Sequence, residues 1–277
     1  MIKIAFLIAA LFGLYSFSKA QLIRYPISLP YVGVTAYSTQ QLDPLSFTGN
    51  PAALASIKNG GLGIYGERRF MLSALSYYTA AANLNSPIGK MGLSFQYGGY
   101  KNFSENKIGL AYAKALGSTV DIGLQFNYYT YRIPAYMSKS SFTATLSAIL
   151  HLSERLHSGI SIFNPVSRKN QKTNPLGIAA EKQAWLYKIG MGYDASSEFY
   201  CSAEVMKEED RPVNITAAIQ YRFLKRIFCR AGILTESGTC YLGLGFGLGK
   251  MRLDISGSYH PQVGISPGIL LVSQWEK

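Results

Sequence analysis

The residues of this sequence whose types and spacing bear on catalysis lie around position 157. His157 adjoins Ser158, and Glu154 precedes them by a few positions, so a base, a nucleophile and an acid occur close together along the chain. This segment alternates as a strand, however, and adjacent strand residues point to opposite faces. Ser158 is therefore directed away from His157. The other two histidines, His151 and His260, belong to no catalytic motif, and we predict no enzyme and no catalytic residue.

A second chemical signal is the spacing of glycines and cysteines. The run LGLGFGLG at 242–249 contains the G-x-G spacing of a phosphate-binding loop, but such a loop opens a helix. Here the run alternates as a strand, so we expect its glycines to make room on one face. Cys201, Cys229 and Cys240 are odd in number and lack the spacing of metal ligands. We predict no cofactor and no metal, and interpret the cysteines as small hydrophobic strand residues.

Ionisable residues on the polar faces of predicted strands form a third set of candidates. Two interpretations remain open. The charges line a conduit or bind the N-terminal segment of the chain, or they pair with one another and hold the interior of the structure together. We favour mutual pairing. The residues concerned are Asp121, Lys188, Glu204, Arg222, Arg230, Arg252 and Asp254.

The elements that position these residues have a period of two. In 121–132 large apolar side chains alternate with polar or small ones, and the same alternation recurs along most of 61–277. We predict an all-β fold of about fourteen antiparallel strands. Their expected spans are 61–67, 70–83, 90–99, 107–115, 119–132, 140–151, 156–163, 184–193, 198–206, 212–223, 227–235, 239–248, 250–258 and 267–275.

The expected connections differ between the two ends of these strands. One set is short: 116–118, 152–155, 194–197, 224–226 and 249. The other set includes longer links: 99–106, 133–139, 164–183 and 259–266. Tight turns at one end and loops at the other are typical of outer-membrane β-barrels, whose turns are periplasmic and whose loops are extracellular.

A soluble β-sandwich or a secreted adhesin is the alternative, because its strands also alternate. The second face distinguishes the two. Here it is rich in Gly, Ser and Ala and poor in Lys and Glu, whereas a soluble sheet exposes charged side chains. Tyr and Trp near the strand ends suit the aromatic girdles of a membrane barrel. We therefore predict a transmembrane antiparallel β-barrel over 61–277.

The N-terminal residues 1–20 have the pattern of a Sec signal peptide. Lys3 precedes an apolar run of Ile4 to Tyr15, and Ser18 and Ala20 supply small residues before the expected cleavage site. A membrane anchor is the alternative, but the run is shorter than the roughly 20 residues that span a bilayer. We predict export to the outer membrane of a Gram-negative cell.

Composition excludes a disordered chain, since 48% of the 277 residues are hydrophobic and only 15% are charged. The net charge of +12 first suggests nucleic acid or an anionic surface. The basic residues are spread over predicted rims and loops, so we predict no nucleic-acid partner. Those on predicted external loops are placed to meet lipopolysaccharide phosphates: Arg68, Arg69, Lys101, Lys107, Arg168, Lys169, Lys172 and Lys182.

Residues 21–60 do not alternate and contain several prolines. Asn50 is a suitable N-cap and Pro51 a suitable first residue for a short helix. An irregular segment of this length before a barrel of intermediate size is most simply placed in the lumen or across its periplasmic mouth. We predict a plug-like or hatch-like segment.

The combination of a signal peptide, a segment ending in GNPAALA (49–55) and about fourteen strands resembles the FadL superfamily of outer-membrane proteins. It is most similar to the short PorV/PorQ-like barrels of Bacteroidota. Asn50, Pro51 and Ala52 match the NPA element before the first strand of that group, and the strand end GISIFNP (159–165) is also similar. The chain lacks the long external loops of larger members.

The resemblance leaves two functions open. The first is a non-enzymatic accessory subunit of an outer-membrane machine, either the type IX secretion translocon or the barrel-assembly complex, with a larger outer-membrane protein as partner. The second is a FadL-like channel for small hydrophobic compounds, with 21–60 as its hatch. We favour the subunit, because short loops leave little equipment for independent action. Outer-membrane lipid and lipopolysaccharide are expected surroundings in both cases.

Overall fold

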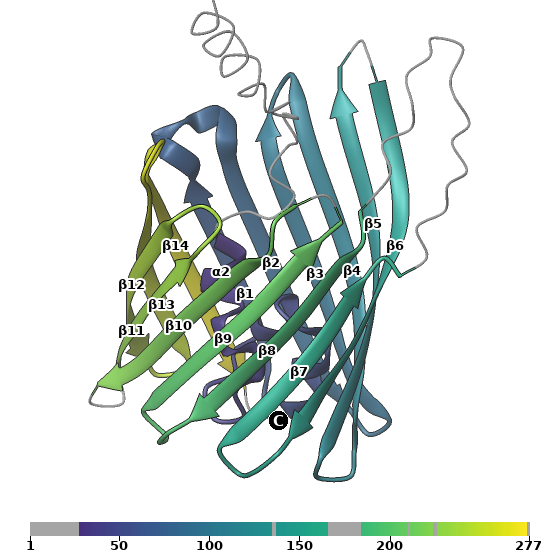
Figure 1. The fold of residues 1–277 in the computed structure, drawn as a ribbon, viewed down its shortest axis with the longest axis vertical. Coiled ribbons are helices and arrows are strands. Elements are labelled where there is room, and N and C mark those ends of the chain that lie inside the picture. Colours follow the sequence, from purple (N-terminus) through teal and green to yellow (C-terminus); the bar gives the residue numbers. More distant parts are fainter. Residues whose placement is uncertain (1–27, 135–136, 166–183, 210, 224–225, 276–277) are drawn as a thin grey trace, which may run out of the picture.

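The computed structural model describes residues 28–134, 137–165, 184–209, 211–223 and 226–275. Within these residues, fourteen antiparallel strands form one closed barrel (Figure 1). Each strand pairs with its neighbours in sequence, and the first strand pairs with the last. The predicted all-β barrel is therefore confirmed. The predicted signal peptide, 1–20, lies outside the described residues.

The strands lie close to their predicted spans. They are β1 (Gly60–Arg68), β2 (Ser76–Ser86), β3 (Gly89–Tyr100), β4 (Phe103–Leu116), β5 (Val120–Ile133), β6 (Met137–His151), β7 (Leu156–Phe163), β8 (Leu186–Asp194), β9 (Phe199–Glu208), β10 (Asn214–Phe223), β11 (Ile227–Leu234), β12 (Thr239–Leu248), β13 (Met251–His260) and β14 (Gly264–Trp275). The described helices are short: the α-helix α2 (Ser28–Val32) and 3-10 helices at Val34–Tyr37, Ser46–Thr48, Pro51–Ser56, Arg69–Met71 and Ser73–Leu75.

The two faces of the sheet separate as the period of two predicts. In β5, Asp121, Gln125 and Asn127 are buried in the lumen, while Ile122 and Phe126 are exposed on the outside. Large apolar side chains cover the outer surface of every strand, with exposed fractions that often exceed 40%. A soluble protein rarely exposes an apolar surface of this extent. The outer surface is therefore suited to lipid.

The turns at the end of the barrel where β14 ends are as short as predicted. At the other end, three predicted loops are too long: the strands leave only 101–102 of the loop 99–106, 134–136 of 133–139, and 261–263 of 259–266. The polar residues there continue strands, since Ser104, Glu105 and Asn106 pair with β5. A polar side chain that faces the lumen does not end a strand. Most of the predicted loop 164–183 lies outside the described residues.

The second strand also begins later than predicted. Residues 69–75 form two 3-10 turns, in which Phe70 and Met71 adopt left-handed backbone angles, with φ of 51° and 60°. The backbone amide of Phe70 donates to Ser266 Oγ at 2.9 Å. This loop carries Phe70 toward the rim of the barrel, where its ring contacts His260.

Residues 28–57 lie inside the barrel, toward the end that carries the C-terminus (Figure 1). We call them the luminal segment. Its apolar side chains Val32, Leu45, Phe47 and Leu54 are completely buried. They pack against small or apolar luminal residues of the strands, such as Ala111. The hydrophobic core of this protein is therefore the interface between the luminal segment and the inner wall.

Glycines of the inner wall leave the space for this segment. A Cβ atom at Gly190 would overlap the ring of Tyr37, one at Gly243 would overlap the hydroxyl of Tyr31, and one at Gly123 would overlap the backbone at Pro51 and Ala52. Further luminal glycines face the segment in the same way: Gly61 meets Pro44, Gly63 meets Leu45, and Gly92 meets Phe47. The glycine run at 242–249 is thus explained in part, because Gly243 accommodates a side chain of the luminal segment.

Adding a side chain at Gly190 should therefore loosen the segment without preventing barrel formation. We expect Gly190→Val to destabilise the luminal segment by about 1–3 kcal/mol, the usual cost of overpacking, measured as faster amide hydrogen exchange in 33–40. Gly257→Val is the matched control, because a Cβ atom at Gly257 meets nothing within 4 Å. Equal exchange in the two variants would contradict the role assigned to Gly190.

Candidate functional site

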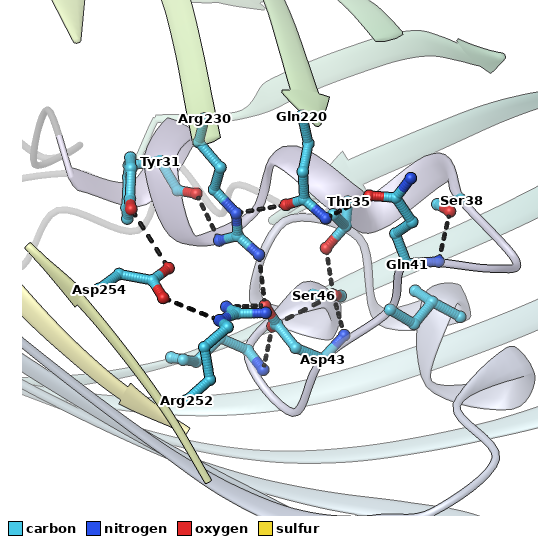
Figure 2. Close-up of polar contacts among 12 residues, drawn as sticks. Tyr31, Thr35, Ser38, Gln41, Asp43, Ser46, Gln220, Arg230, Arg252 and Asp254 are labelled. Atoms are coloured by element: carbon cyan, nitrogen blue, oxygen red, sulfur yellow. Dashed lines mark hydrogen bonds and ion pairs between the residues drawn. The ribbon is translucent and has the colours of Figure 1, made fainter. Parts of the chain in front are cut away.

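The most strongly buried charges of the protein meet at Asp43 of the luminal segment (Figure 2). Its carboxylate lies 2.7 Å from Arg230 Nη2 and 2.8 Å from Arg252 Nη2. Arg252 also donates through Nε to Asp254 at 2.9 Å, and Asp254 accepts from the Tyr31 hydroxyl at 3.2 Å. Two arginines and an aspartate of the wall thus enclose one aspartate and one tyrosine of the segment.

Further hydrogen bonds hold the groups around Asp43 in place. Arg230 donates to the side chain of Gln220 and, at 3.2 Å, to the backbone carbonyl of Tyr31. Gln220 in turn donates to Gln41 of the luminal segment. Burial raises the pKa of Asp43, but the two guanidinium groups lower it further, so that it lies below its ordinary value. The carboxylate is therefore ionised, as a buried ion pair requires.

A second contact lies on the neighbouring strands β8 and β9. Lys188 Nζ is 3.1 Å from Glu204 Oε1, and the Tyr37 hydroxyl donates to Glu204 Oε2 at 2.6 Å. Lys188 also donates to the backbone carbonyl of Gly49 at 3.3 Å. Burial is the main cause that raises the pKa of Tyr37 well above its usual value, so its hydroxyl stays a donor. The pair is joined to two separate parts of the luminal segment.

The motif Asn50-Pro51-Ala52 forms the start of the 3-10 helix Pro51–Ser56. Asn50 Oδ1 accepts from the backbone amide of Ala52 at 3.0 Å, which makes Asn50 the N-cap, and Pro51 occupies the first helical position. The same amide lies 2.9 Å from Ser147 Oγ of β6. The capped helix therefore lies directly against the inner wall.

The remaining predicted charges lie nearer the turns. Asp121 accepts from Ser56 Oγ at 2.5 Å and lies 3.1 Å from His151 Nε2. Arg222 donates from Nη2 to the backbone carbonyl of Ser197 at 2.6 Å and joins none of these clusters. Lys188 and Glu204 pair with each other, as do Arg252 and Asp254. The pairing that we favoured is incomplete, however, since five of the seven residues also bond the luminal segment directly through a side chain of that segment.

Five residues in fact make such bonds: Asp121, Glu204, Arg230, Arg252 and Asp254. Sequence reasoning missed their partners Tyr31, Tyr37 and Asp43. A usable signal existed for Asp43, because it is the only acidic residue between positions 21 and 60. An isolated acid before a barrel with several inward basic residues favours a contact between them.

Above the luminal segment lies a cavity of about 640 Å³, which we call the vestibule. Its floor includes Pro30, Val34 and Tyr37, and its wall includes Leu234 and Tyr241. The rim carries Phe70, His260 and Pro261, which belong to the loop end of the barrel. Two basic and three acidic side chains line the cavity, namely Lys188, Arg211, Glu204, Glu208 and Glu236. The vestibule is thus closed below by the luminal segment and has mixed apolar and polar walls.

Two basic residues expected on external loops are placed differently. Arg69 is buried and lies 2.8 Å from Glu67 Oε1, with its guanidinium over the Tyr77 ring. Lys107 belongs to β4 and lies over the ring of Tyr129. Lys107 was predicted in a loop because a polar strand end resembles a loop in sequence, whereas Arg69 does lie in the loop 69–75 but has a buried side chain. Arg168, Lys169, Lys172 and Lys182 lie outside the described residues.

Among the residues that the structure describes, no group of three or more His, Cys, Asp or Glu side chains is placed to hold a metal ion. No helix in the described ranges has the length and apolarity needed to cross a membrane. Ser158 faces away from His157, as predicted, and donates to the backbone carbonyl of Gly190.

Comparisons with known proteins agree with the fold. No protein-family model matches the chain, and no curated protein matches it. Among solved structures, the CymD monoaromatic hydrocarbon channel is similar, with a TM-score of 0.64 at 11% identity over 91% of this chain and 97% of that one. The *P. putida* toluene transporter TodX has a TM-score of 0.57 at 8% identity over 89% of this chain and 99% of that one. The chain therefore has the fold of outer-membrane β-barrel channels.

Removing the charge of Asp43 should release the luminal segment. We expect Asp43→Asn to cost about 3–5 kcal/mol, because two buried guanidinium groups lose their counter-ion. The measurement is amide exchange of 28–57 relative to β12 and β13. Asp43 has a lowered pKa, so its contribution is complete above the ordinary value of 3.8 and is lost as the pH falls through the lower folded value. The variant should lack this acid-dependent loss, and Glu198→Gln, at a turn, is the control.

Proposed function

We propose that the protein is an outer-membrane channel that takes up small, mainly apolar molecules through the vestibule, with the luminal segment as its closure. The observation that carries this proposal is the cavity of about 640 Å³ between the loop end and the luminal segment. Cavities of about 300–1,000 Å³ are typical of small-molecule sites. CymD is a monoaromatic hydrocarbon channel and TodX is a toluene transporter, and their similar folds support the same class of function.

The chemistry of the walls supports a ligand without negative charge. Apolar side chains such as Val34, Leu234 and Tyr241 supply the contact surface, while Lys188 is already neutralised by Glu204 at 3.1 Å. The acidic side chains around the cavity outnumber the basic ones by one. An anion would therefore meet no unpaired cation among the described residues of the walls, whereas a neutral apolar molecule meets no charge penalty.

Filling the vestibule tests this function. Ala218 is buried and lines the cavity, while its neighbour Ala217 lies on the opposite face of β10. We expect Ala218→Trp to reduce uptake of a neutral naphthalene-based fluorescent probe into proteoliposomes to the protein-free level. Ala217→Trp should leave uptake unchanged. Equal uptake by both variants, or no uptake by the unaltered protein, would exclude this channel function.

A second candidate is an accessory subunit of an outer-membrane machine such as the type IX secretion translocon or the barrel-assembly complex. The observation that favours it is the firm closure of the lumen, since residues from Tyr31 to Ser56 bond to the wall. A barrel filled in this way can act as a scaffold without transporting anything.

Purification in mild detergent distinguishes the two candidates. A subunit should bring down a larger outer-membrane protein in stoichiometric amount, and deletion of 28–57 should release it. A channel should purify alone, and the same deletion should open a pore that conducts ions in planar bilayers. Purification alone together with a silent deletion variant would contradict both.

A further inference from the structure

Two histidines that serve no part of the vestibule lie face to face near the turn end of the barrel. His151 and His157 pair across β6 and β7, and their Nδ1 atoms are 2.9 Å apart. The other ring nitrogen of each faces a carboxylate. His151 Nε2 lies 3.1 Å from Asp121 Oδ2, and His157 Nε2 lies 3.4 Å from Asp194 Oδ2. Asp121, His151, His157 and Asp194 thus form one continuous chain of polar contacts.

The luminal segment is hydrogen-bonded to both ends of this chain of polar contacts, at Asp121 and at Asp194. Ser56 Oγ donates to Asp121 Oδ2 at 2.5 Å. At the other end, Ser38 Oγ donates to Asp194 Oδ1 at 2.6 Å, and the backbone amide of Thr39 donates to Asp194 Oδ2 at 2.9 Å. Two separate parts of the segment, at Ser38–Thr39 and at Ser56, therefore depend on the same four side chains of the wall.

The number of protons on the two rings follows from this geometry. His151 Nε2 faces Asp121, so it carries a hydrogen that it donates. His157 Nε2 lies 3.4 Å from both Asp194 Oδ2 and Thr39 Oγ1. Because the Thr39 hydroxyl itself donates to Asp194 at 3.2 Å, His157 Nε2 is also left to donate. The two Nδ1 atoms face each other within hydrogen-bond distance, so one of them carries a hydrogen and the other accepts it. Three ring hydrogens on two imidazoles leave one positive charge shared between His151 and His157. Both rings are largely buried, with 15% and 2% of their side-chain surfaces exposed.

We propose that this shared proton makes the histidine pair a pH-sensitive latch that holds the luminal segment to the wall. A fourth proton, taken from water on acidification, binds the accepting Nδ1. Two N–H groups then face each other at 2.9 Å on two positive rings, so the contact breaks and the carboxylates at its ends are displaced from Ser38, Thr39 and Ser56. Loss of the third proton also breaks the contact. With two ring hydrogens left, either the two Nδ1 lone pairs face each other or the lone pair of one Nε2 faces a carboxylate.

Other charged and titratable groups close to the chain are compatible with one shared positive charge. Lys90 lies near Asp121, Lys58 lies near Lys90, and Tyr200 lies near Asp194. Lys90 Nζ donates to the backbone carbonyl of Ile57 at 2.6 Å, which occupies it within the luminal segment. The two carboxylates carry one negative charge more than the rings, and Lys90 lies on the side of this excess. The latch is independent of whether the vestibule transports a ligand.

Hydrogen exchange of the full protein in detergent micelles tests the latch. Between pH 8 and pH 5.5, histidine is the side chain type whose ordinary pKa lies within the range. After correction for intrinsic rates, we expect exchange at 38–41 and 56–57 to rise at least about tenfold on acidification, as loss of one charge-assisted hydrogen bond implies. Amides of β12 and β13 should not change. The increase should be absent in His151→Gln and in His157→Gln, whose segments exchange fast at every pH.

The remaining histidine supplies the matched control. His260 lies at the vestibule rim and touches neither ring of the pair, so His260→Gln should keep the full pH response. Imidazole ¹⁵N NMR of the unaltered protein gives a readout that does not depend on a variant folding, and we expect three ring hydrogens on His151 and His157 at neutral pH. A pH-independent segment, or two neutral rings, would overturn the proposal. Stoichiometric zinc or copper in the purified protein would overturn it too, because a cation would then replace the proton.

Discussion

The structure depends on the interaction between Asp43 and the two arginines Arg230 and Arg252. Burying a single charge costs several kcal/mol unless an opposite charge meets it. The barrel wall buries guanidinium groups in its lumen, and the luminal segment supplies the carboxylate that neutralises them. Neither part is electrostatically complete alone. The position of the segment in the lumen, the floor of the vestibule and the geometry around Tyr31 all follow from this requirement.

The shape of the inner wall favours the same position of the luminal segment as the charges do. The inner wall carries glycine at several points where a bulky side chain of the luminal segment approaches, as at Gly190 beneath Tyr37 and Gly243 beneath Tyr31. A glycine in a strand sacrifices packing and backbone order. Here the loss is recovered, because the aromatic rings fill the space and bury apolar surface. The protein therefore replaces side chains of its own wall with side chains from its N-terminal segment.

The two ends of the barrel differ in what they offer. The loop end opens into the vestibule, whereas the turn end holds the histidine pair His151 and His157 and the attachment points of the luminal segment. The luminal segment is hydrogen-bonded to the wall near the turn end and forms the floor of the vestibule. It therefore contacts both the histidine pair and the vestibule. Residues 38–40 directly follow Tyr37, whose hydroxyl donates to Glu204 beside Lys188 in the vestibule floor.

The sequence by itself determined the strands, their alternating faces and the inward position of charges such as Asp121 and Arg230, because period-two patterning is a local property that a bilayer makes strict. It also predicted the capped helix at Asn50, whose signal is confined to neighbouring residues. Only the tertiary structure decided which charges meet. Asp43 lies 187 positions from Arg230, and His157 reaches His151 only through strand register. The first contact is set by barrel closure and the second by the exact register of the β6–β7 hairpin, and no local pattern encodes either.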